Sequence, residues 1–176
     1  MTTTTRPFLA ALLALTLALP TNIYLIGDGI GAGIQFALFR YQQTYMGTNL
    51  ITLFRDLDYV TSGILAGRSA LSVLLWLGGT LLLLVAVACL VLKRHEEYET
   101  FRKPLSLLVT GAGIAYLAAV IAQYGPLFHG PAGFSVPVGV PLLLGVAWII
   151  SRGTEEENER EEDGMSCIGE DGPGKE

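Results

Sequence analysis

Most side chains able to do chemistry in the first half of the sequence lie in one stretch. Three arginines and three aspartates fall between residues 27 and 68: Asp28, Arg40, Arg55, Asp56, Asp58 and Arg68. Carboxylate and guanidinium groups form ion pairs or hold polar ligands through charge-assisted hydrogen bonds. The stretch is therefore a candidate interaction surface.

No set of residues indicates an enzyme. Asp56 and Asp58 are the candidate pair of carboxylates, but they are expected on the turn of a surface helix, and His129 has no second histidine at metal-ligand spacing. Cys89 and Cys167 lack the C-x-x-C spacing of a metal or redox site. We therefore predict a protein that is not an enzyme, with no catalytic residue, no metal and no cofactor.

Residues 27–32 match the letters G-x-G-x-x-A, but a dinucleotide fingerprint also needs a βαβ unit and an acidic residue about 20 positions further on. The next acidic residue after this segment is Asp56. The glycines, four apart, are better explained as helix-packing positions or as a hinge.

Composition indicates a membrane protein. Half of the residues, 51%, are hydrophobic and only 15% are charged, whereas soluble domains carry about 25% charged residues. Four apolar segments approach the roughly 20 residues that a helix needs to cross a bilayer. They cover about 7–26, 64–92, 105–124 and 134–150.

We predict that all four segments are helices, because an isolated span must satisfy its backbone hydrogen bonds internally. The expected fold is all-α: a polytopic four-transmembrane-helix bundle formed by residues 1–152. Ser135 is expected to cap the fourth span. The first span has one alternative, a cleaved signal peptide.

The basic residues predict the orientation. Residues 93–103 hold four lysines and arginines, and residues 125–133 hold none. By the positive-inside rule, 93–103 and both termini face the cytoplasm, and 27–63 and 125–133 face outward. The expected location is the cell membrane.

The outer segment 27–63 is predicted to form two short amphipathic helices. Ile34, Ala37, Leu38, Tyr41 and Tyr45 recur at helical spacing, and Leu50, Leu53, Phe54 and Leu57 repeat it after a break at 46–49. Such helices lie on a membrane surface, although a re-entrant segment over 29–46 is the alternative. The candidate outer surface comprises Asp28, Arg40, Tyr41, Tyr45, Phe54, Arg55, Asp56 and Arg68.

Small residues in the third span predict close helix packing. Gly111, Ala115 and Ala119 are spaced four apart, and Gly63 and Gly67 repeat the spacing before the second span. The sequence leaves open whether the facing helix belongs to the same chain, to a second copy or to another membrane protein.

Residues 153–176 hold ten acidic residues against two basic ones, and we predict a disordered cytoplasmic tail. The expected function is that of a structural or accessory subunit that contacts lipid and no nucleic acid. The alternative is a small transporter, channel or outward-facing ligand sensor that uses 27–63. The spans offer that alternative few polar residues: Asn22, Thr80, Ser106, Thr110 and Gln123.

Overall fold

The computed structural model describes residues 5–27, 29–92 and 98–152. Asp28, the connection 93–97 and the predicted tail lie outside these residues. The helices are α1 (Thr5–Ala18), α2 (Leu53–Thr61), α3 (Gly67–Leu92), α4 (Tyr98–Tyr124) and α5 (Gly139–Arg152). The strands are β1 (Asn22–Ile26), β2 (Gly31–Gln35), β3 (Phe39–Thr44), β4 (Gly47–Thr52), β5 (His129–Gly130) and β6 (Gly133–Val136).

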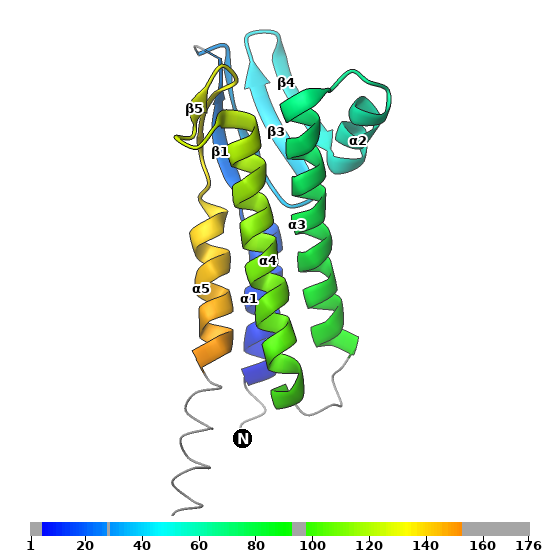
Figure 1. The fold of residues 1–176 in the computed structure, drawn as a ribbon, viewed down its shortest axis with the longest axis vertical. Coiled ribbons are helices and arrows are strands. Elements are labelled where there is room, and N and C mark those ends of the chain that lie inside the picture. Colours follow the sequence, from blue (N-terminus) through cyan, green and yellow to red (C-terminus); the bar gives the residue numbers. More distant parts are fainter. Residues whose placement is uncertain (1–4, 28, 93–97, 153–176) are drawn as a thin grey trace, which may run out of the picture.

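Two long helices form the axis of the molecule. Figure 1 shows α3 and α4 side by side, with α1 and α5 beside their lower parts and the strands and α2 beside their upper parts. Leu13, Leu83, Leu105 and Leu143 come from the four bundle helices and are buried in one apolar cluster. This cluster holds the lower half together.

The upper half is built on an antiparallel sheet with the strand order β4-β3-β2-β1-β6-β5. The strand β1 pairs with β2 on one side and with β6, from much later in the chain, on the other. The sheet therefore joins the segment after α1 to the segment before α5.

The turn between β2 and β3 attaches the sheet to α3. The indole Nε1 of Trp76 donates to the carbonyl of Phe36 at 3.1 Å, and the hydroxyl of Thr80 donates to the carbonyl of Ala37 at 2.7 Å. The side chains of Ala37, Trp76 and Thr80 are buried. Each buried carbonyl thus has a partner, as buried backbone groups require.

The prediction of an all-α four-helix transmembrane bundle is wrong, because the structure contains a six-stranded sheet. By length and composition, two of the described helices could cross a membrane: α3 and the Arg102–Tyr124 part of α4. The predicted spans 7–26 and 134–150 are each divided between a helix of 14 residues and a strand. The helix α1 ends before Pro20, whose ring disfavours helical geometry in the preceding residue.

The first predicted amphipathic helix, which carried Ile34 to Tyr45, is also wrong, since this segment contains parts of β2 and β3. Ile34 and Tyr41 do share a face, but they do so as a cross-strand pair. The second amphipathic segment contains α2, whose first turn is capped by the Thr52 hydroxyl, which accepts a hydrogen bond from the Arg55 amide at 3.4 Å. The predicted cap Ser135 lies instead within β6.

Candidate functional site

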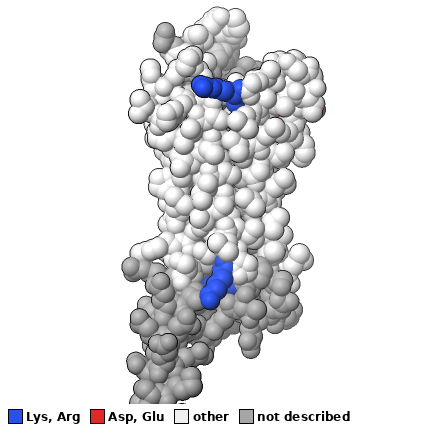
Figure 2. Space-filling view, viewed as in Figure 1, with Lys and Arg blue, Asp and Glu red and all other residues white. Residues whose placement is uncertain are grey.

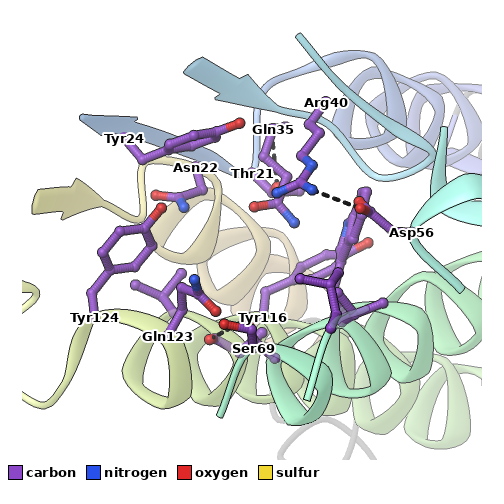
Figure 3. Close-up of a pocket in the computed structure, with 16 residues that line it drawn as sticks. Thr21, Asn22, Tyr24, Gln35, Arg40, Asp56, Ser69, Tyr116, Gln123 and Tyr124 are labelled. Atoms are coloured by element: carbon purple, nitrogen blue, oxygen red, sulfur yellow. Dashed lines mark hydrogen bonds and ion pairs between the residues drawn. The ribbon is translucent and has the colours of Figure 1, made fainter. Parts of the chain in front are cut away.

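A polar cavity of about 80 Å³ lies between the sheet and the upper parts of α3 and α4. This volume has room for a few water molecules or one small organic molecule. Figure 3 shows side chains reaching it from both sides. Ten of the lining residues are labelled there: Thr21, Asn22, Tyr24, Gln35, Arg40, Asp56, Ser69, Tyr116, Gln123 and Tyr124.

An ion pair closes one end of this cavity. Nη2 of Arg40 donates to Oδ1 of Asp56 at 2.6 Å. Arg40 lies on β3, between Gln35 of β2 and Ile51 of β4 in the sheet register. Asp56 lies in the first turn of α2, where the helix dipole favours a negative charge. The hairpin of β3 and β4 leads directly into α2 and so brings the two charges together.

The pair is buried unequally and is incompletely satisfied. The Asp56 side chain is 0% exposed and that of Arg40 is 26% exposed. Oδ2 of Asp56 and Nε of Arg40 are buried, and neither has a hydrogen-bond partner among the described residues. Burial raises the pKa of the Asp56 carboxyl above its usual range, while the Arg40 guanidinium opposes that rise. The ion pair therefore leaves one buried acceptor and one buried donor without a partner among the described residues.

The sheet contributes a second polar cluster. The Ser135 hydroxyl lies 2.6 Å from Oδ1 of Asn22, joining β6 to β1, and both side chains are buried. The ring of Tyr24 lies over Gly33 on β2, where an added Cβ would come within 2.3 Å of the ring. Glycine at this position is what allows Tyr24 to lie flat against the inner face of the sheet.

The helices supply the opposite wall. Ser69 comes from α3, and Tyr116, Gln123 and Tyr124 come from α4 (Figure 3). The rings of Tyr24 and Tyr124 are 6.3 Å apart, within the range of favourable aromatic contact. The wall thus combines aromatic surface with an amide and a hydroxyl, groups that can orient a small ligand.

Recognition of a polar molecule is the chemistry that this arrangement supports. Within the described residues, no three His, Cys, Asp or Glu side chains are close enough together to hold a metal ion. The second oxygen of Asp56 has the capacity to accept a hydrogen bond and the Nε of Arg40 the capacity to donate one, and neither capacity is used by the described residues. A molecule that presents a donor next to an acceptor complements both.

The structure brings together only two residues of the predicted outer surface, Arg40 and Asp56. Arg55 is exposed on α2 and donates to the hydroxyl of Tyr59 at 2.8 Å. The remaining described members of the surface are exposed and line no part of the cavity: Tyr41, Tyr45, Phe54 and Arg68. Asp28 lies outside the described residues.

The predicted packing residues fall into two groups. An added Cβ at Gly111 would lie 3.3 Å from Leu82, and the Ala119 carbonyl accepts a hydrogen bond from Ser72 at 2.8 Å. Both contacts are with α3 of the same chain, and Ala115, between them on α4, is half-buried. The other two glycines, Gly63 and Gly67, have positive φ and open space around them.

Sequence reasoning missed most of the cavity, although two signals were available. Asn22 and Gln123 stand out as polar residues in apolar segments, and both line the cavity. Tyr24, Gln35 and Ser69 gave no comparable signal, because their grouping depends on sheet pairing and on helix position. No protein-family model matches the chain, and a search of curated proteins found no significant match.

Proposed function

We propose that this chain is a multi-pass membrane protein that binds a small polar molecule in the cavity between its sheet and helices. The observation that carries the proposal is Asp56, a fully buried carboxylate with one oxygen paired to Arg40 and the other unpartnered. Burying a charge without a full set of partners is costly. A ligand that donates to Oδ2 offsets part of that cost.

Two described helices support the membrane location, α3 with 26 residues and the 23-residue part of α4. On the face drawn in Figure 2, the surface between the upper and lower blue side chains is white, without Lys, Arg, Asp or Glu. The start of α1 and the end of α5 lie at the end of the molecule opposite the sheet (Figure 1). The start of α1 and the end of α5 thus lie at the same end of the molecule as the end of α3 and the start of α4. The four basic residues of 93–103 favour the cytoplasm for that end, which puts the sheet and the cavity outside.

The electrostatics of the pair indicate the class of ligand. A simple anion near Arg40 is repelled by Asp56, and a simple cation near Asp56 is repelled by Arg40. A neutral amide or a zwitterion such as an amino acid satisfies both groups without leaving an excess charge. We therefore propose a ligand that carries a donor and an acceptor close together, recognised without chemical change.

A structural or accessory subunit is the second candidate. The apolar surface of α4 favours it, since Leu107 and Ile114 are 73% and 58% exposed. Two of the three small residues that suggested a partner helix, Gly111 and Ala119, contact α3 of the same chain instead. The ligand-binding function therefore has the stronger support.

Saturation-transfer NMR on the detergent-solubilised protein tests the proposal with four probes: acetamide, glycine, acetate and methylammonium. We expect transfer to acetamide or glycine that is lost in Asp56→Asn and in Arg40→Gln, and much weaker transfer to the two singly charged probes. Asp58→Asn, an exposed change on the same helix, should leave the signals intact. Equal signals from the wild type and both pair variants would refute the site.

A further inference from the structure

Asn22 is a buried amide in the wall of the cavity. It is the first residue of β1, it is 2% exposed, and it lines the cavity. Burying an amide costs free energy unless its oxygen and its nitrogen have hydrogen-bond partners. The partners of these two atoms therefore indicate what this side chain can bind.

The oxygen of this amide is bound by the neighbouring strand. The Ser135 hydroxyl donates to Oδ1 of Asn22 at 2.6 Å. Ser135 is 1% exposed and lies on β6, which pairs with β1, so the sheet fixes the two residues relative to each other. The bond orients the amide: Oδ1 lies toward Ser135, and Nδ2, with its two N–H donors, points away from it.

The amide nitrogen is left for a ligand. Within the part of the chain that the structure describes, no residue accepts a hydrogen bond from Nδ2 of Asn22. Figure 3 shows the Asn22 side chain on the side of the cavity where Tyr24 and Tyr124 lie, apart from the Arg40–Asp56 pair. The cavity thus has unused hydrogen-bonding groups in two places, at the ion pair and at Asn22.

Other polar groups of the wall are in a different position. Three hydroxyls each make a hydrogen bond within the protein: those of Thr21, Ser72 and Tyr116. Three further polar side chains are only half-buried and are less costly to leave unpaired: Gln35, Ser69 and Gln123. Asn22 differs from both groups, because it is buried and still has donors to offer.

We infer that Nδ2 of Asn22 is a second recognition point of the proposed site, and that the ligand carries a hydrogen-bond acceptor at the end that lies away from Arg40 and Asp56. This inference rests on the proposed function. It narrows the ligand to a short molecule with two polar ends: an amide or zwitterionic group for the ion pair, and a carbonyl or ether oxygen for Asn22. Ser135 is a positioning residue, because it holds the amide in the orientation that presents the donors.

A second recognition point makes the site selective. A ligand that fills the cavity without an acceptor removes water from Nδ2 of Asn22 and gives nothing in return. Sites that contain such a buried polar group reject analogues that lack the matching atom. The affinity for molecules of one size should therefore depend on whether the acceptor is present.

Two probes of the same shape test the inference. Acetoacetamide and isovaleramide have the same arrangement of heavy atoms and the same primary amide, but the ketone oxygen of acetoacetamide is a methyl group in isovaleramide. Titration of each probe by saturation-transfer NMR on the detergent-solubilised full chain gives its dissociation constant. We expect acetoacetamide to bind about three- to ten-fold more tightly, the effect of one additional hydrogen bond, although isovaleramide is the more apolar probe.

Three variants assign this difference to Asn22. Asn22→Leu removes the donors at nearly constant volume and should bring the ratio of the two dissociation constants to one or reverse it. Ser135→Ala releases the amide and should lower the ratio while both probes still bind, and it gives an independent test should Asn22→Leu fail to fold. Asn49→Leu changes an exposed asparagine on β4 and should leave the ratio unchanged. A purely structural role of Asn22 and Ser135 would weaken both probes alike and leave the ratio as in the wild type.

The other outcomes separate this inference from the proposed function. Equal affinity of the wild type for both probes, with both signals lost in Asp56→Asn, would refute the second recognition point and leave the proposed site standing. A signal from acetamide and from neither larger probe would show that the cavity has no room for a second acceptor, and the inference would be wrong. A ratio that persists in Asn22→Leu and in Ser135→Ala would show that another group binds the acceptor. Signals that are unchanged in Asp56→Asn and in Arg40→Gln would refute the proposed function and this inference with it.

Discussion

Nη2 of Arg40 lies 2.6 Å from Oδ1 of Asp56, and the two side chains come from β3 and α2. The pair couples the sheet to the helix that follows it. Asp56 is 0% exposed, so water does not stabilise its negative charge. The stabilisation of that charge depends on Arg40 and on any group that contacts the second carboxylate oxygen. The pair is therefore both a structural contact and the centre of the proposed site.

Removing one partner should destabilise the protein. We expect Asp56→Asn to lower the free energy of unfolding by about 2–3 kcal/mol, somewhat less than the ~3–5 kcal/mol of a fully buried pair, because Arg40 keeps contact with solvent. Chemical denaturation in detergent measures this change. The control is Asp58→Asn, which alters an exposed side chain on the same helix and should change the value by less than about 0.5 kcal/mol. Equal changes in the free energy of unfolding for the two variants would mean that the Arg40–Asp56 pair contributes nothing to stability.

The pair should also make stability depend on pH. Burial raises the pKa of the Asp56 carboxyl in the folded protein, so the folded state keeps this proton to a higher pH than the unfolded chain does. The contribution of Asp56 to the free energy of unfolding is therefore fully present below about pH 4, the ordinary range of an aspartate. It is lost as the pH rises through the raised pKa that Asp56 has in the folded protein.

Denaturation of the wild type and Asp56→Asn over a range of pH tests this expectation. The stability of the wild type relative to the variant should fall as pH rises above about 4. A relative stability that rises over the same interval would mean that Arg40 outweighs burial and lowers the pKa.

Gly33 should be intolerant of a side chain. An added Cβ would lie 2.3 Å from the ring of Tyr24, so Gly33→Ala should cost about 1–3 kcal/mol, the range for overpacking. Gly78→Ala on α3 is the matched control, since nothing lies within 4 Å of that position. Adding Tyr24→Ala to Gly33→Ala should cost less than the sum of the single changes, because the clash disappears. Strict additivity would contradict the contact.

The contact between α3 and α4 should fail when Gly79 is enlarged. An added Cβ there would come 2.9 Å from the ring of Tyr116 and 3.2 Å from the carbonyl of Ala112. Gly79→Leu should therefore lower the melting temperature in detergent by at least several degrees. Gly145→Leu on α5 meets open space and should change it little. Similar melting temperatures for the two variants would show that α3 and α4 do not pack as described.

The two long helices could be predicted from the sequence, because 73–92 and 105–124 are long apolar runs without a charged residue, in which local composition decides the structure. The sheet could not. Ile23-Tyr-Leu-Ile26 resembles the end of a span until its neighbours are known, and β1 pairs with β6 through Ser135, a contact far apart in the sequence. The exposed apolar residues of the strands, such as Ile23 and Ile34, also resemble those of a helix that faces lipid. The strands therefore do not show the polar outer positions by which a strand is usually recognised in a sequence.

A minority of the residues that line the cavity could be predicted from the sequence. Arg40 and Asp56 stood out as charges beside apolar segments, and Asn22 and Gln123 as polar residues within them. Their grouping was not predictable, because it depends on the inward side of each strand. A shift of one residue in register would turn Arg40 to the outer face and Tyr41 to the cavity.

The most direct test of the central claim is the reactivity of a cysteine placed in the cavity. Ser69 lines it from α3, and Ser69→Cys, in a background with Cys89→Ala and Cys167→Ala, should react in intact cells with a membrane-impermeant zwitterionic thiol reagent. Saturating acetamide or glycine should slow the reaction several-fold, and adding Asp56→Asn should abolish that protection. A cysteine at 69 that stays unreactive from outside, or that reacts at the same rate with and without both probes, would contradict an outward-facing cavity that binds a small polar molecule.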